Sequence, residues 1–196
     1  MKVCVFASSS DYIDSGHFDV ASELGVLLAK VNIDVVFGGG GIGLMGKLAD
    51  AVIENGGKIT GVIPHFMKKA GWGHAGVTDM ILTDDMSERK KTMFSLADAV
   101  IALPGGVGTL EELTEAITLK QLGLFNKPII IINTLDFYKR LLAFFAEMVK
   151  GQFMREEHKK IWQVVSNADE ALKYLADERS WKKEPVFVMT GKIASR

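Results

Sequence analysis

Residues 104–112 read PGGVGTLEE and directly follow an apolar run, AVIAL, at residues 99–103. The apolar run is typical of a buried strand, and the spacing of leucine, alanine and isoleucine after the glycines is typical of a helix. A glycine-rich turn therefore joins the carboxyl end of a strand to the start of a helix. Bare backbone N–H groups at such a turn, helped by the helix dipole, bind anions. Glu112 adds a carboxylate beside this expected anion site, which favours chemistry on a phosphorylated small molecule.

The rest of the chain repeats this alternation of short apolar runs and helical patterns. We expect strands at residues 2–7, 33–37, 58–63, 80–83, 99–103 and 128–132, with a short seventh at 162–165. We expect helices at residues 14–31, 44–55, 87–96, 110–122, 137–150 and 168–176. Buried strands separated by helices predict an α/β fold, a Rossmann-like parallel sheet of six to seven strands with helices on both faces.

The composition is that of an ordinary globular protein. The chain has 196 residues, of which 48% are hydrophobic and 24% charged, and its formal net charge is -1. Neither a nucleic-acid polymer nor a membrane is therefore expected as a partner. The single cysteine, Cys4, and the lack of a signal-peptide pattern favour a cytoplasmic location. The helical pattern fades near residue 177, which predicts one nucleotide-binding Rossmann-like domain at 1–177 and a C-terminal tail at 178–196.

A second glycine-rich stretch, GGGGIGLMG at residues 38–46, also joins an expected strand to an expected helix. Gly41, Gly43 and Gly46 match the G-x-G-x-x-G pattern of dinucleotide sites. Such a site also needs an acidic residue about 20 residues further on. The next expected strand ends instead at Pro64, so NAD is not expected. A tight turn that needs glycine for close packing is the alternative without a ligand.

The same stretch is a near match to a phosphate-binding P-loop, with Lys47 in the lysine position. The next residue, Leu48, has no hydroxyl for magnesium, which argues against a kinase or a nucleoside triphosphatase. Four consecutive glycines exceed what a turn needs, so ligand contact is the favoured interpretation. The loops after the first, second and fifth expected strands should converge at the carboxyl ends of the strands. The candidate contacts are Gly39 and Gly40 in this stretch and Ser9 in the loop after the first expected strand.

Residues 85–91, DMSERKK, indicate a helix start at which Asp85 or Ser87 would be the N-cap. Positive charge is unfavourable at this end of the helix dipole. An anionic ligand beside Arg89 and Lys90 would remove the conflict. On this basis, replacing Arg89 with alanine is expected to leave the ligand-free protein about as stable.

Glu112 has two competing interpretations. With Thr109 as the N-cap of its helix, residues 109–112 form a capping box in which Glu112 bonds back to the Thr109 N–H. Alternatively, the carboxylate faces the anion site and takes part in chemistry. The spacing alone does not decide between them.

Metal and cofactor sites are not expected. His17, His65, His74 and His158 lack the spacing of metal ligands and have no clustered cysteine or aspartate partner. Lys90 lacks the supporting partners of a pyridoxal-phosphate lysine. We therefore expect no metal and no cofactor, and reject lysine decarboxylation.

Three motifs together resemble the LONELY GUY (LOG) family of phosphoribohydrolases, often mislabelled as lysine decarboxylases. They are the stretch at 38–46, the triplet Glu88-Arg89-Lys90, and P-G-G-x-G-T-x-x-E at 104–112. The resemblance covers about residues 2–176. It implies a Rossmann-like homodimer that cleaves the N-glycosidic bond of a nucleoside 5′-monophosphate, such as AMP or a cytokinin riboside monophosphate. The products would be a free base and ribose 5-phosphate.

The resemblance also implies roles for individual residues. The family's essential arginine and glutamate fall on Arg89 and Glu112. Its substrate and phosphate contacts fall on Lys90, Gly105, Gly106, Val107, Gly108, Thr109, Glu111 and Thr118. Many members carry a glutamate where this chain has Gly71, in a loop that shapes the base pocket, so the preferred base stays open. The alternative function is a non-catalytic carrier of a nucleotide or of the molybdenum cofactor, which would not need the arginine and glutamate.

Overall fold

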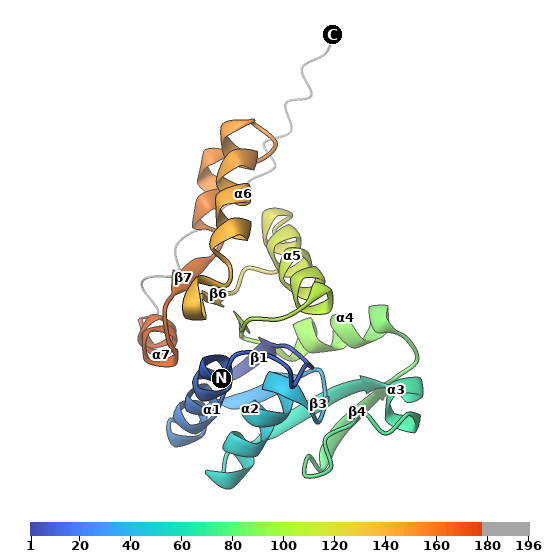
Figure 1. Ribbon diagram of the computed structural model, residues 1–196. Coiled ribbons are helices and arrows are strands. Elements are labelled where there is room, and N and C mark those ends of the chain that lie inside the picture. The colour runs from blue at the N-terminus through green and yellow to red at the C-terminus, as the bar shows by residue number, and fades with distance from the viewer. Residues whose placement is uncertain (178–196) are drawn as a thin grey trace.

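A single parallel sheet organises residues 1–177, which are the part of the chain that the computed structural model describes (Figure 1). Its strand order is β4-β3-β2-β1-β5-β6-β7, and every neighbouring pair is parallel. The strands are β1 (Lys2–Phe6), β2 (Asp34–Phe37), β3 (Ile59–Pro64), β4 (Asp79–Thr83), β5 (Ala99–Ala102), β6 (Ile129–Ile132) and β7 (Gln163–Val165). The expected α/β Rossmann-like fold is confirmed, and the expected tail at 178–196 lies outside the described residues.

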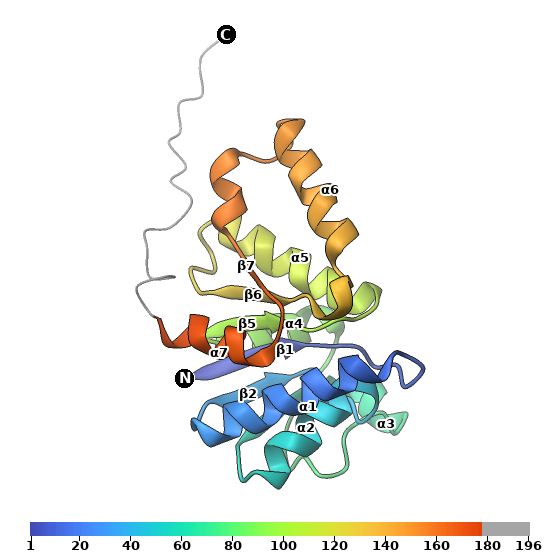
Figure 2. The same ribbon diagram turned by 60° about the vertical axis from the view of Figure 1, so that its left-hand side comes forward.

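Helices cover both faces of the sheet (Figures 1 and 2). They are α1 (Ser15–Lys30), α2 (Gly43–Glu54), α3 (His65–Lys69), α4 (Met86–Leu96), α5 (Val107–Gln121), α6 (Lys139–Lys150) and α7 (Ala168–Ala176), with short 3-10 turns η1 (Thr134–Asp136) and η2 (Glu156–Lys160). None of these described helices has both the length and the apolarity needed to cross a bilayer.

Alternate residues of each central strand point into two separate cores. In β1, Val3 and Val5 pack with α1, α2 and α7, whereas Cys4 and Phe6 pack with α4, α5 and α6. This alternation follows from the two-residue period of a strand. Because both faces are covered, the central strands are apolar at nearly every position, which is why their sequence reads as unbroken hydrophobic runs.

The strand order reverses at β1, between β2 and β5. Ligands of open α/β sheets bind outside the carboxyl ends of the strands at such a switch point. Here the loops after β1, β2 and β5 meet. The Ser8 N–H donates to the carbonyl of Pro104 at 3.1 Å, and the Met45 N–H donates to the carbonyl of Ser8 at 3.2 Å. The two glycine-rich loops therefore lie at one edge of the sheet, as the sequence predicted.

The short helix α3 was not predicted from the sequence. None of its residues is buried, so it carries no apolar periodicity. Helix α6 begins at Lys139, two residues later than predicted. Before it, Leu135 and Asp136 adopt left-handed backbone angles, with φ of 53° and 58°.

Candidate active site

A buried ion pair joins α4 to α5 near the carboxyl ends of the central strands. Arg89 Nη1 donates to Glu112 Oε1 at 3.2 Å, and both side chains are less than a tenth exposed. Arg89 Nε also donates to the carbonyl of Val62 at 3.0 Å, and Nη2 donates to the carbonyl of Gly38 at 3.2 Å. One guanidinium thus ties the ends of β2 and β3 to the carboxylate on α5.

These bonds correct the expectation that Arg89 needs an anionic ligand. The Glu112 carboxylate and two carbonyl groups already satisfy the guanidinium in the free protein. Of the two candidate N-caps of α4, the structure selects Asp85, whose side chain accepts the Glu88 N–H at 2.8 Å. Arg89 lies further along the helix and its side chain turns inward. Removing the Arg89 side chain would therefore leave the Glu112 carboxylate and two buried carbonyl groups without this partner.

Gly38 is required by the same pair. A Cβ at this position would lie 1.9 Å from Arg89 Nη2. At least one of the four consecutive glycines is thus needed to make room for a buried side chain. This role is neither a requirement of a turn nor a contact with a ligand.

The capping-box interpretation of Glu112 is wrong. Helix α5 begins at Val107, three residues earlier than predicted, and its N-cap is Gly106. The Thr109 side chain packs onto Gly105, where a Cβ would lie 2.1 Å from Thr109 Oγ1. Glu112 is therefore in the second turn of α5 and bonds to Arg89 instead of to the helix end.

Burial raises the pKa of the Glu112 carboxyl from 4.5 to about 7, against the opposing effect of the Arg89 charge. Glu111 raises the pKa further through its own negative charge. A carboxyl group with a pKa near neutrality can both hold and release a proton at working pH.

Lys90 lies beside this pair and bridges two acids of α5. Its ammonium donates to Glu111 Oε1 and lies 2.8 Å from Glu115 Oε2. Burial opposes the charged form of Lys90, but its hydrogen bonds to Glu111 and Glu115 raise its pKa overall.

The first glycine-rich loop, at residues 104–109, leaves its backbone accessible. Cβ atoms added at Gly106 or Gly108 would meet no other described atom within 4 Å, and Val107 between them is exposed. No side chain among residues 1–177 caps the start of α5. The N–H groups of its first turn are therefore free to bind an anion.

The second glycine-rich loop differs in this respect. The Gly43 N–H at the start of α2 donates to Asp11 Oδ1 at 2.8 Å. A carboxylate already occupies this helix end, and its charge disfavours a phosphate there. Of the two loops, the one at 105–109 offers an anion the more favourable surroundings.

The other predicted contacts lie in different surroundings. Gly39 is buried and its carbonyl accepts the His74 N–H at 2.9 Å, whereas Gly40 is half-buried and forms an isolated bridge with Gly73. Ser9 is exposed. Thr118 is also exposed but lies nine residues beyond Thr109, about 13 Å along α5. The structure thus brings Arg89, Lys90, Glu111 and Glu112 close to the first loop, but not Thr118.

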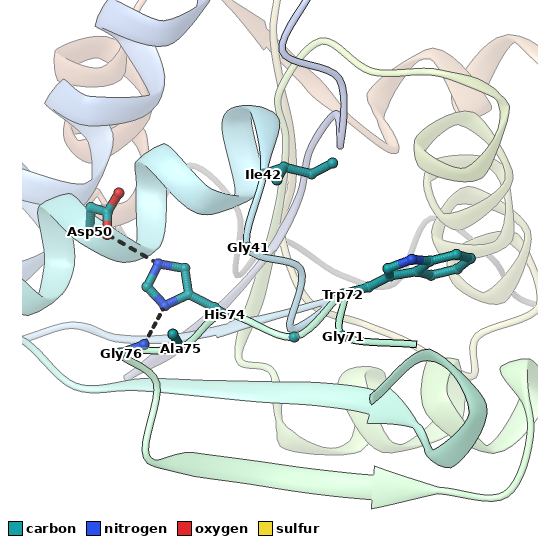
Figure 3. Close-up of a pocket in the computed structure, with 9 residues that line it drawn as sticks. Gly41, Ile42, Asp50, Gly71, Trp72, His74, Ala75 and Gly76 are labelled. Atoms are coloured by element: carbon teal, nitrogen blue, oxygen red, sulfur yellow. Dashed lines mark hydrogen bonds and ion pairs between the residues drawn. The ribbon is translucent and has the colours of Figure 1, made fainter. Parts of the chain in front are cut away.

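A cavity of about 500 Å³ lies beside the second glycine-rich loop and was not predicted in this form (Figure 3). It is lined by Gly41, Ile42, Asp50, Gly71, Trp72, Gly73, His74, Ala75 and Gly76. The Gly76 N–H donates to His74 Nδ1 and His74 Nε2 contacts Asp50 Oδ1, both at 3.1 Å. The His74 and Trp72 side chains point to opposite sides of their loop (Figure 3). The only sequence signal was the loop itself, because Asp50 is distant in the chain.

Comparison with known proteins decides the family. A family model described as "Possible lysine decarboxylase" matches residues 45–175. The cytokinin riboside 5′-monophosphate phosphoribohydrolase LOG1 of Arabidopsis thaliana is 38% identical over 195 residues, covering 94% of this chain and 92% of LOG1. LOG4 of the same plant is 40% identical over 176 residues, covering 90% and 82%. The chain belongs to the LOG family.

Solved structures share the fold of this LOG-family chain. The molybdenum cofactor carrier protein of Chlamydomonas reinhardtii superimposes with a TM-score of 0.67 at 20% identity, covering 89% of this chain and 96% of the carrier. A structural genomics target gives a TM-score of 0.70 at 24% identity, with 89% and 98% covered. At these identities the likeness establishes the fold alone.

The bonds of Arg89 predict a stability effect opposite to the one expected from the sequence. Arg89→Met should lower the free energy of unfolding by about 3–5 kcal/mol, because it leaves Glu112 buried without its partner. The double variant Arg89→Met/Glu112→Leu should lose less than the single variant. Urea denaturation at pH 7.5 measures both. An Arg89→Met protein as stable as the parent would contradict the structural role of the pair.

The raised pKa of Glu112 also predicts how stability depends on pH. The folded pKa is about 7 and the unfolded value 4.5, so the folded state holds its proton longer as pH rises. Stability from this group is therefore lost between about pH 4.5 and 7. The parent should lose about 3 kcal/mol relative to Glu112→Gln across this window. Denaturant titrations at several pH values measure it. Glu54→Gln, at an exposed position at the end of α2, is the control that should keep the parent's pH dependence.

Proposed function

We propose that this protein is a phosphoribohydrolase that cleaves the N-glycosidic bond of a nucleoside 5′-monophosphate into a free base and ribose 5-phosphate. The observation that carries the proposal is the Glu112 carboxylate, held by Arg89 one helical turn from the open glycine loop. LOG1 and LOG4, at 38% and 40% identity, bear the name of such an enzyme for cytokinin riboside monophosphates. We propose AMP or a cytokinin riboside monophosphate as the substrate.

The phosphate would bind to the backbone of residues 105–109, where the uncapped end of α5 provides N–H groups and a favourable dipole. Gly108 and Glu112 are four residues apart, which is about 6 Å along the helix. One pentose ring can bridge this separation. The phosphate would thereby place C1′ of the ribose near the carboxylate.

Glycosidic cleavage passes through a transition state with positive charge on the ribose. The ionised Glu112 carboxylate would stabilise that charge or accept a proton from the attacking water. The oxygen of that water bonds to C1′, and the electron pair of the broken bond leaves with the base, which takes up a proton at a ring nitrogen. Since the Glu112 pKa is about 7, the carboxylate is available near neutral pH.

Arg89 would position Glu112, because its three hydrogen bonds fix the guanidinium against the ends of β2 and β3. Lysine would not replace it, since an ammonium lacks the planar fork that reaches several acceptors at once. The buried arginine and glutamate favour an enzyme over a carrier. Lys90 is paired with Glu111 and Glu115, which disfavours a Schiff-base role in lysine decarboxylation.

We also propose that the protein is cytoplasmic and forms a homodimer. Large apolar side chains are exposed on α6 and on the segments that follow α5 and α6. They are Leu122, Leu124, Phe144 and Phe153. Exposed apolar groups of this kind are typical of surfaces that associate.

The phosphate anchor predicts a preference for nucleotides. AMP should yield adenine and ribose 5-phosphate, whereas adenosine should react poorly because it lacks the anchored group. Glu112→Gln should lower turnover of AMP by on the order of 100-fold or more. Chromatography of free adenine measures both. Equal rates with AMP and adenosine would contradict the role of the loop, and release of no base from a broad panel of monophosphates would favour the carrier.

The open space beside Gly108 predicts that a substitution there weakens substrate binding without lowering stability. Gly108→Ala adds a methyl group that meets no described atom in the free protein, and alanine favours a helix by about 1 kcal/mol over glycine. Its melting temperature should therefore stay the same or rise. Its KM for AMP should rise by at least tenfold, because the methyl group occupies the space of the phosphate. A Gly108→Ala protein with the parent's KM would place the phosphate elsewhere.

A further inference from the structure

We propose that Tyr138 is a positioning residue that fixes the entry of the phosphate loop through its hydrogen bond to the Leu103 carbonyl. The inference rests on the proposed function, since it concerns the same loop. Tyr138 is buried, and its phenol donates to the carbonyl of Leu103 at 2.7 Å. Leu103 is the last residue before the loop, so a change in this carbonyl's position is passed directly to Pro104 and the glycines.

The sheet holds this entry point firmly on one side. The Leu103 N–H donates to the carbonyl of Phe6 at 2.9 Å, and the carbonyl of Pro104 accepts the Ser8 N–H at 3.1 Å. Both bonds come from β1 and the loop that follows it. The segment is therefore held on one side by β1 and the loop that follows β1.

On the other side the backbone ladder stops too early. The pairing of β5 with β6 ends at Ala102 and Ile131, and the Asn133 N–H turns away to the carbonyl of Val165. Beyond the ladder, the Tyr138 hydroxyl donates to the carbonyl of Leu103 from the core that α4, α5 and α6 cover. A side chain thus holds the backbone at the residue where the loop begins, one residue beyond the end of the pairing with β6.

The chain strains its backbone to place this side chain. Leu135 and Asp136 both adopt left-handed angles, which cost non-glycine residues about 1–2 kcal/mol each. The Asn133 side chain stabilises the result by accepting the Tyr138 N–H at 2.7 Å. The Phe137 ring also packs edge-to-face on the Tyr138 ring, with centroids 4.9 Å apart. Backbone strain that is held in place by such contacts is typical of segments with a functional task.

The phenol acts as a donor and not as a general acid or base. Burial, and then the negative charge of Glu112, raise the pKa of Tyr138 well above its usual value. The hydroxyl therefore keeps its proton at every working pH.

Tyr138→Phe tests the proposal because it removes only the hydroxyl. We expect KM for AMP and the dissociation constant for ribose 5-phosphate to rise about tenfold, while kcat stays within about twofold. The kcat/KM for adenosine, which has no phosphate to anchor, should stay unchanged. Steady-state kinetics and isothermal titration calorimetry with ribose 5-phosphate give these values.

Phe145→Leu is the matched control. Phe145 is buried on α6 in the same core as Tyr138 but contributes no hydrogen bond to the loop. This variant should lose stability without a change in ribose 5-phosphate affinity. If Tyr138→Phe lowers kcat on AMP and adenosine alike with unchanged ribose 5-phosphate affinity, the positioning role is wrong.

The binding measurement separates this inference from the proposed function. If the parent binds ribose 5-phosphate but hydrolyses no nucleotide, the hydrolase proposal fails, and the affinity of Tyr138→Phe still decides the role of Tyr138. If the parent binds no ribose 5-phosphate, the loop is not a phosphate site and the proposal for Tyr138 is overturned.

Discussion

The buried pair of Arg89 and Glu112 is the constraint on which the rest of the site depends. Taking two charges out of water is unfavourable, and it is tolerated only where the remaining hydrogen-bonding groups are satisfied. The carbonyls of Gly38 and Val62 provide that satisfaction, because the ends of β2 and β3 lie side by side. The sheet therefore supplies acceptors for the arginine, and the arginine supplies the counter-charge for the glutamate.

The two glycine-rich loops show how similar sequences serve different physical ends. At 38–46, glycine admits the Arg89 side chain and the close contact of α2 with the loop after β1, and Asp11 occupies the helix end. At 104–109, Gly105 packs under Thr109, whereas Gly106 and Gly108 face open space. Composition alone makes the loop at 38–46 look richer in ligand contacts, but the structure favours the loop at 104–109.

Most of the fold could be predicted because it follows from local pattern. Unbroken apolar runs as short and as rich in β-branched residues as 129–132 indicate strands buried on both faces, and their alternation with helices indicates a parallel sheet. The pairing of Arg89 with Glu112 could not be derived from spacing, since the two residues are 23 positions apart and meet through two different helices. The start of α5 was misplaced because Thr109 and Glu112 fit a capping box. Packing of Thr109 onto Gly105 overrides that local preference.

The uncapped start of α5 has a consequence for the protein in the cell. A helix end without a side-chain cap is a weak point of the fold, and a bound phosphate would serve as the missing cap. Any nucleotide or sugar phosphate that binds there favours the folded state by mass action, by about 2.7 kcal/mol at a hundred times its dissociation constant. The resistance of the protein to heat and proteolysis would then follow the supply of its own substrate and product.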